Sequence, residues 1–143
     1  MSTTALLEGV AARLAAGGVG VWRSTGLYAE EDVAIVLGGL PQSPDSSVAL
    51  AAYGVADDPA LSDSTEGLQV TVRRGGRDPR PVLDLADAVF GVLQGVHGVD
   101  LGGVRVVQCL RRSWSLLGQD GNGRWRLAQN FYVDIHRPSL HRI

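Results

Sequence analysis

Residues 66–98, EGLQVTVRRGGRDPRPVLDLADAVFGVLQGVHG, contain the change of pattern that decides the predicted fold. Up to Arg73, apolar and polar side chains alternate, which predicts a strand with one apolar face and one solvent-facing side. From Val82 onward, apolar residues recur at helical spacing instead. Asp78 with Pro79 provides a helix start, and Gly95 provides a place to end. We therefore expect a strand, a tight glycine turn and an amphipathic helix that covers a sheet.

Further elements are predicted on either side of this stretch. A first helix, capped by Thr3 or Thr4, should end at Gly17. Apolar runs and alternations predict strands at residues 33–38, 47–55, 104–111 and 124–137, with a hairpin turn at DGNG, residues 120–123. Residues 19–32 are interpreted as a short extended piece around Val21 and Trp22 followed by an acidic loop, and residues 99–103 as a short link. Together these elements predict an α+β fold, with a mostly antiparallel sheet of about five strands packed against two helices.

Length and composition favour one domain over residues 1–143. The chain has 143 residues, of which 45% are hydrophobic and 20% charged, enough to bury a single core. No segment approaches the roughly 20 consecutive apolar residues that a membrane helix needs. The start of the chain also lacks the basic and apolar regions of a secretory signal. We expect a protein made in a cytoplasm, with no membrane partner.

Charge is distributed unevenly along the chain. Residues 1–66 hold nine acidic residues and two arginines, whereas residues 67–143 hold six acidic residues and eleven arginines. Such an asymmetry is compatible with head-to-tail packing of identical copies, in which an acidic surface meets a basic one. The alternative is that the charges intermingle once the chain folds.

Motifs that carry chemistry are missing from the sequence. Its three histidines, at positions 97, 136 and 141, lack the spacing or the companion cysteines of a metal site. The abundant glycines form neither a phosphate-binding loop nor a dinucleotide fingerprint, and there is no nucleophile elbow. Cys109, the only cysteine, lies within a predicted strand and is interpreted as a core residue. The sequence therefore predicts no catalytic, cofactor or metal residues and no enzyme.

An arginine cluster gives the alternative reading, a nucleic-acid-binding module. Its members are Arg73, Arg74, Arg77 and Arg80, which Arg111, Arg112 and Trp114 could extend. A pI near 5.8 and the lack of a recognition helix argue against sequence-specific DNA binding. Loose, non-specific contact with passing DNA stays possible.

The overall pattern of the chain from Ala5 onward resembles a known family. The residues that carry the resemblance are Pro59 to Ser64, Gly67, Gln69, Val70, Arg74, the segment LDLADAVF at 83–90, LGGV at 101–104, Arg112, Ser113, Gly123, Arg124, Asn130, Tyr132, Arg137, Pro138, Ser139, His141 and Arg142. This pattern is similar to the tail terminator, or "minor capsid", proteins of long-tailed actinobacterial phages and prophages.

The resemblance implies a structural virion protein without catalytic residues. Related tail terminators form a ring, a hexamer, on the head-proximal end of the tail tube. There the ring ends tube polymerisation and offers a surface to the neck of the head. The implied partners are further copies of the chain, the tail tube protein and a neck or stopper protein, and the implied location is the neck of the virion. Another head–tail connector, a stopper or an adaptor, remains the neighbouring possibility.

Two groups of charged and apolar residues are the predicted contact sites of such an assembly. One is the loop at residues 57–65 and the other consists of arginines on or next to strands. The residues are Asp57, Asp58, Leu61 and Asp63, together with Arg73, Arg74, Arg111 and Arg112. The alternative for each is plain exposure to solvent.

Overall fold

The computed structural model describes residues 2–57 and 63–136, which form two helices and seven strands. In chain order they are α1 (Thr3–Ala16), β1 (Val21–Trp22), β2 (Ala34–Leu37), β3 (Ser47–Asp57), β4 (Asp63–Arg74), α2 (Arg80–Leu93), β5 (His97–Leu101), β6 (Val104–Gln119) and β7 (Trp125–His136).

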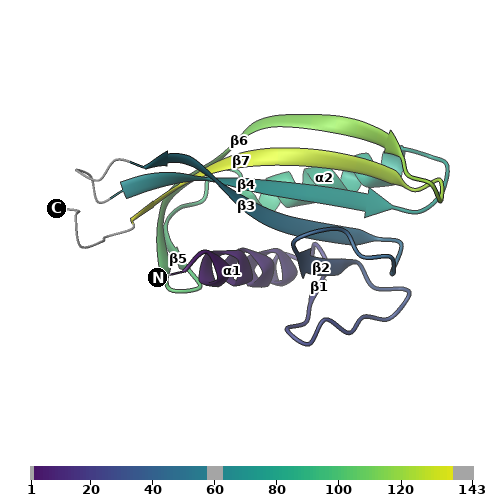
Figure 1. The fold of residues 1–143 in the computed structure, drawn as a ribbon, viewed down its shortest axis with the longest axis horizontal. Coiled ribbons are helices and arrows are strands. Elements are labelled where there is room, and N and C mark those ends of the chain that lie inside the picture. The colour runs from purple at the N-terminus through teal and green to yellow at the C-terminus, as the bar shows by residue number, and fades with distance from the viewer. Residues whose placement is uncertain (1, 58–62, 137–143) are drawn as a thin grey trace.

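All seven strands belong to one sheet with the order β1-β2-β3-β4-β7-β6-β5. The pairs β1–β2 and β2–β3 are parallel, and the other four neighbouring pairs are antiparallel. Helix α1 packs against β1, β2, β3 and β5, while α2 packs against β4, β6 and β7 (Figure 1). The helices also contact each other, so both lie on the same face of the sheet. We call this the inner face.

The prediction of a mostly antiparallel sheet of about five strands is wrong, because the sheet is mixed and has seven strands. The class α+β with two helices holds. Strand β1 coincides with the extended piece expected around Val21 and Trp22, but its two residues are too few to show a period, so it was not counted as a strand of the sheet. Strand β5, with the sequence HGVDL, buries only Leu101 and has no apolar alternation to reveal it. The parallel direction of β2 depends on the loop at 38–46, which returns the chain to the start of β3.

The core lies on the inner face of the sheet. The alternation of apolar and polar residues along β4 and β7 correctly predicted which side chains belong to it. On β4 the buried apolar residues are Leu68, Val70 and Val72, and on β7 they are Leu127, Phe131, Val133 and Ile135. Helix α2 contributes Val82, Leu85, Ala86, Val89 and Leu93 to the same cluster. Asp78 accepts a hydrogen bond from the Arg80 backbone N–H (2.9 Å), as predicted, but Pro79 occupies the N-cap position, so the helix begins at Arg80 rather than at Pro79.

Helix α1 is fixed to the turn between β5 and β6 by a close backbone approach. Gly102 in that turn has a φ of +59°, and a Cβ there would lie 1.8 Å from the Ala5 carbonyl oxygen. A Cβ on Gly9 would lie 2.3 Å from the Gly102 backbone nitrogen. Only glycine fits both positions. The helix starts one residue earlier than predicted, because Ser2 rather than Thr3 or Thr4 provides the cap, accepting from the Ala5 N–H at 3.0 Å.

The opposite, outer face of the sheet carries polar and aromatic side chains. Asn130 on β7 sits near its middle, where its amide oxygen accepts from the Tyr53 hydroxyl (3.3 Å) and its amide nitrogen donates to Ser113 (3.2 Å). These bonds join β3, β7 and β6 across the outer face. No helix among the described residues packs on this side.

Candidate assembly surface

The acidic group of predicted contact residues lies at one end of the sheet, where β3 ends and β4 begins. Asp57 is the last residue of β3, and Asp63 is the first residue of β4. Asp58 and Leu61 lie outside the described residues. Asp63 also contacts the ring of His136 on β7, with 3.1 Å between Oδ1 and Nδ1. The two described aspartates thus border the connection between β3 and β4.

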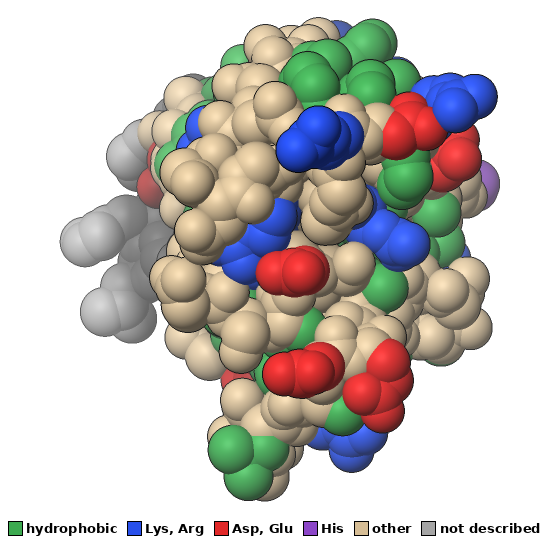
Figure 2. Space-filling model, turned by 90° about the vertical axis from the view of Figure 1, so that its right-hand side faces the viewer, with side chains coloured by type: hydrophobic (Ala, Val, Ile, Leu, Met, Phe, Trp, Pro, Cys, Tyr) green, Lys and Arg blue, Asp and Glu red, His purple; other side chains and the backbone are tan. Residues whose placement is uncertain are grey.

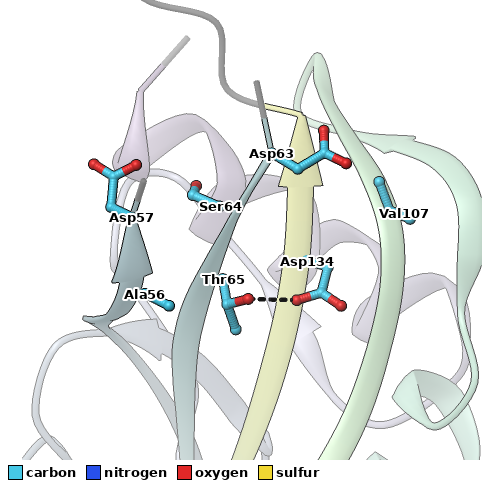
Figure 3. A pocket seen from close by; sticks show the side chains of 7 residues that line it. All are labelled: Ala56, Asp57, Asp63, Ser64, Thr65, Val107 and Asp134. Atoms are coloured by element: carbon cyan, nitrogen blue, oxygen red, sulfur yellow. Dashed lines mark hydrogen bonds between the residues drawn. The ribbon is translucent and has the colours of Figure 1, made fainter. Parts of the chain in front are cut away.

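A shallow hollow of about 510 Å³ opens beside these aspartates. It lies across the ends of four neighbouring strands, β3, β4, β7 and β6 (Figure 3). Inside it the Thr65 hydroxyl donates to Asp134 at 2.6 Å. The lining residues are Ala56, Asp57, Asp63, Ser64, Thr65, Val107 and Asp134. The hollow is acidic and open, and it lies on an edge of the molecule rather than in an enclosed cleft.

Arg73, in contrast, is part of the fold. Its side chain lies on the outer side of β4, but the loop at 38–46 covers it, so the residue is only 3% exposed. The guanidinium donates to the carbonyl oxygens of Asp45 and Pro44, each at 2.8 Å. Burial, and then the neighbouring Arg124, lower the pKa of Arg73 from its ordinary value. Arg73 therefore holds the loop that sets the direction of β3, while Arg74 is partly exposed beside it.

Arg124 fixes the same loop, a role for which the sequence contains no separate signal. Its Nε donates to Asp120 at 2.9 Å within the β6–β7 hairpin. Its Nη1 contacts Asp45 at 3.2 Å and the Gln42 carbonyl oxygen at 2.7 Å. These contacts tie the hairpin to the loop; the side chain of Arg124 is only 9% exposed, whereas that of Asp45 is 70% exposed.

The uneven charge of the sequence is therefore not divided cleanly between two faces at this end of the molecule. Asp45, from the acidic half of the chain, pairs with Arg124, from the basic half. Figure 2 shows this end, where arginine side chains alternate with acidic ones and a hydrophobic area lies beside them. Arg80 also pairs with Asp78 at 2.7 Å. With Arg73 buried and Arg80 paired, the Arg73–Arg80 cluster does not form a continuous basic surface.

The other two arginines lie on β6, on opposite faces. Arg111 is on the inner side, where its guanidinium stacks over Phe90 with 4.1 Å to the ring centroid. It also donates to the buried amide oxygen of Gln129 at 3.0 Å, and Gln129 donates to the Ala86 carbonyl of α2 at 3.2 Å. Arg112 is exposed on the outer side, 5.3 Å from the ring of Tyr132. Arg111 thus links β6 to α2, and Arg112 is free to meet solvent or a partner.

Beyond these arginines, β6 exposes an apolar segment that the sequence prediction missed. Trp114 is 52% exposed, Leu116 40% and Leu117 46%. The predicted strand stopped at Arg111, but β6 continues to Gln119. Register shifts between Arg111 and Ser113 and between Leu116 and Gly118 break the alternation in this segment. Beta-bulges of this kind hide a strand from a period-two pattern.

Cys109 is buried, as predicted, and its burial raises the pKa of the thiol to about 12, so it is not a thiolate at neutral pH. Across residues 2–57 and 63–136, no three His, Cys, Asp or Glu side chains are grouped to hold a metal ion. None of the helices described is long and apolar enough to span a membrane.

Comparison with protein families gives a match that spans most of the chain. A family model described as "Bacteriophage tail terminator protein" matches residues 13–137. This range runs from the last turns of α1 to the end of β7 and includes both groups of predicted contact residues. Among curated proteins, the comparison finds no match.

Solved structures contain the same fold. A chain in the structure titled "Virion of native gene transfer agent (GTA) particle" matches with a TM-score of 0.55 and 18% sequence identity. The match covers 70% of this chain and 77% of that one. At this level of identity the likeness concerns the arrangement of helices and strands alone.

Proposed function

The chain belongs to the bacteriophage tail terminator family. Because of this membership, we propose that it forms a ring on the head-proximal end of a phage tail tube. In this proposal the ring has six copies, as the sequence resemblance implies. It ends polymerisation of the tube and presents the surface to which the neck of the head attaches. Its partners are the tail tube protein on one side and a neck or stopper protein on the other.

The observation that carries this proposal is the family match over residues 13–137. A fold shared with a chain of a gene transfer agent virion supports a place within a virion, here the neck. The exposed arginine and apolar side chains of β6 also suit a protein that works by contact with other subunits. We expect assembly in the host cytoplasm before the tail joins the head.

A ring of identical copies makes a specific demand on the chain. Each copy must offer two different surfaces that fit each other, because a closed ring is built from head-to-tail contacts. The acidic strand ends near Asp57 and the basic start of the β6 segment near Arg112 are candidates of opposite charge. DNA that passes through the ring needs an opening without tight basic pockets, so contact with it would be transient and non-specific.

The test is reconstitution with the tail tube protein of the same phage. We expect rings of uniform copy number by native mass spectrometry, bound at one end of each tube in electron micrographs, and shorter tubes as more of the chain is added. A chain that stays monomeric with tubes present, and leaves tube growth unchanged, would contradict the proposal. Rings that bind the neck protein but not tube ends would instead identify a stopper or an adaptor.

A further inference from the structure

Strand β6 leaves half of its length without a second neighbour. On the side away from β7, its first part pairs with β5, and its Cys109 exchanges backbone hydrogen bonds with Gly95 and Val96. The Arg111 N–H is then covered by the Gln94 side chain at 2.7 Å. From Arg112 to Gln119, β7 is the only strand beside β6 among the described residues.

This open edge has the features that promote pairing with another chain. Every second residue of an edge strand points its N–H and C=O away from its one partner. Proteins that stay monomeric usually protect such edges with charges, bulges, proline or very short strands. This edge has two bulges and the charge of Arg112, but it also exposes Trp114, Leu116 and Leu117 by 52%, 40% and 46%. The stretch Ser113–Leu116 between the bulges stays regular and can form the centre of a pairing.

A second open edge lies at the other side of the sheet. Strand β2 pairs with β3 only from Ser47 to Leu50. From Ala51 to Asp57, β4 is the only described strand beside β3. Tyr53 and Val55 in this stretch are 40% and 38% exposed. The edge is thus of similar length to the one on β6 and also apolar.

The two edges are complementary in charge, direction and position. The β3 edge ends at Asp57, and the β6 edge begins at Arg112. Within one chain, β3 and β6 run in opposite directions. Rotation about a ring axis keeps the direction of each strand relative to that axis, so β3 of one copy would lie antiparallel to β6 of the next copy. Across the sheet, Ser113 on β6 pairs with Asn130 on β7, Asn130 pairs with Gln69 on β4, and Gln69 pairs with Ala51 on β3. From this row of paired residues, the β6 edge and the β3 edge extend in opposite directions along the sheet.

This diagonal placement requires a stagger between copies. Strands that close into a ring tilt by about 35–45° to its axis, and the tilt shifts each strand along its neighbour. The shift moves the β3 edge of one copy towards the β6 edge of the next.

We propose that the β6 edge, Arg112–Gln119, pairs antiparallel with the β3 edge, Ala51–Asp57, of a neighbouring copy, and that this strand pairing closes the ring. The proposal rests on the proposed function, since it assigns the contacts of that ring. Each chain has one β6 edge and one β3 edge, so in a closed ring every β6 edge is paired with the β3 edge of the next copy. A peptide from another protein would cover one edge and leave the other exposed, and for this reason the occupant is a second copy.

Disulfide trapping tests the pairing directly. Ser113 and Ser115 on β6 and Ala51 and Tyr53 on β3 all point to the outer face, so cysteines can be placed in four pairs, one from each strand. Within one chain the two strands are three strand spacings apart, about 14 Å. A disulfide spans at most about 7 Å between Cα atoms, so any bond must join two copies. The native Cys109 is 3% exposed and does not compete.

We expect at least one of the four double variants, assembled with tail tubes and oxidised, to give a ladder of linked chains that ends at the ring size. The control pairs Ser115→Cys with Asp84→Cys, on the exposed side of α2, and should stay unlinked. A second readout compares Leu117→Lys with Leu27→Lys, since Leu27 is 75% exposed but lies in a loop away from both edges. Leu117→Lys should abolish rings at unchanged melting temperature, and Leu27→Lys should not.

The outcomes separate the inference from the function it rests on. Intact rings with no link in any of the four pairs, and with Leu117→Lys still assembling, would overturn the strand pairing and leave the ring proposal standing. An unmodified chain that forms no ring, even on tubes, would remove both.

Discussion

The loop at residues 38–46 and the open edge of β6 both lie next to arginines, yet these arginines have different roles. At the loop, Arg73 and Arg124 are almost fully buried and donate to Pro44, Asp45 and other groups of the chain itself. At the β6 edge, Arg112 is exposed and contacts only the ring of Tyr132 among the described interactions. Position in the sequence does not separate the two roles, but burial does.

This difference shows how one molecule combines a fixed interior with a surface reserved for partners. Arginine suits both places, because its planar fork can satisfy several buried carbonyl and carboxylate oxygens, and its stem can also rest on an exposed aromatic ring. Mutations at the loop should therefore act on folding. Mutations at the β6 edge should act on assembly.

The largest expected effect on stability is that of Arg73→Ala. The substitution removes the donor to the Asp45 carbonyl oxygen and one of the two donors to the Pro44 carbonyl oxygen, where the Ser47 hydroxyl remains, and it opens the contact that holds the loop. We therefore expect a loss of about 2–3 kcal/mol in the free energy of unfolding. Urea titration followed by circular dichroism measures it. The matched control Arg112→Ala should lose no more than about 0.5–1 kcal/mol. Equal losses in the two variants would remove the distinction between the two regions.

A smaller effect is expected on the inner side of β7, at Gln129. This residue is fully buried, and Gln129→Leu deprives Arg111 of an acceptor and removes the link to the Ala86 carbonyl. We expect a loss of about 1–2 kcal/mol by thermal or urea unfolding. Gln69→Leu, at an exposed position of β4, should stay within about 0.5 kcal/mol. A neutral Gln129→Leu would show that Arg111 does not depend on this bridge.

The smallest expected effect is a pH dependence at Asp120, in the β6–β7 hairpin that Arg124 ties to the loop at 38–46. The backbone N–H of Arg124 donates to Asp120, and this bond, with others from Asn122 and from the Arg124 side chain, lowers the pKa of Asp120 below 3.8. Because the folded-state pKa is lowered, the stabilisation is present above that ordinary value and is lost as the pH falls through the lower, folded-state pKa. Asp120→Asn should therefore be less stable than the unmodified chain at neutral pH, and the difference should shrink on acidification.

Unfolding curves taken from neutral pH down to about pH 3 would measure this difference. Asp84→Asn, on the exposed side of α2, serves as the control and should follow the unmodified chain throughout. A stability gap between Asp120→Asn and the unmodified chain that widens in acid would contradict the assigned sign.

The sequence predicted the elements with a strong period and missed those without one. The alternation along β4 and β7, the helical spacing of α2 and the turn at Asp120–Gly123 all appear in the structure, with Gly123 at a φ of +75°. Strands β1 and β5 are too short or too polar to show a pattern, and bulges hide the second half of β6. The failure to predict the second half of β6 matters most, because this part of the strand is the open edge.

The contact residues were harder to predict than the fold. Arg73 and Arg112 look alike in the sequence, since each is one of two adjacent arginines in a strand. Only the loop at 38–46, brought in from a distant part of the chain, distinguishes them by covering Arg73. The exposure of Trp114 and Leu117 depends in the same way on where β5 begins, since His97 pairs with Gln108 and no described strand other than β7 lies beside β6 beyond Arg111.

A cryo-EM reconstruction of tail tubes capped by this chain tests most directly whether β6 and β3 of neighbouring copies pair to close a ring. We expect a single ring at one end of each tube, with β6 of every copy beside β3 of the next and the outer faces joined into one sheet. Tube ends without the chain, or copies that meet through their helices with both strand edges open, would contradict the account.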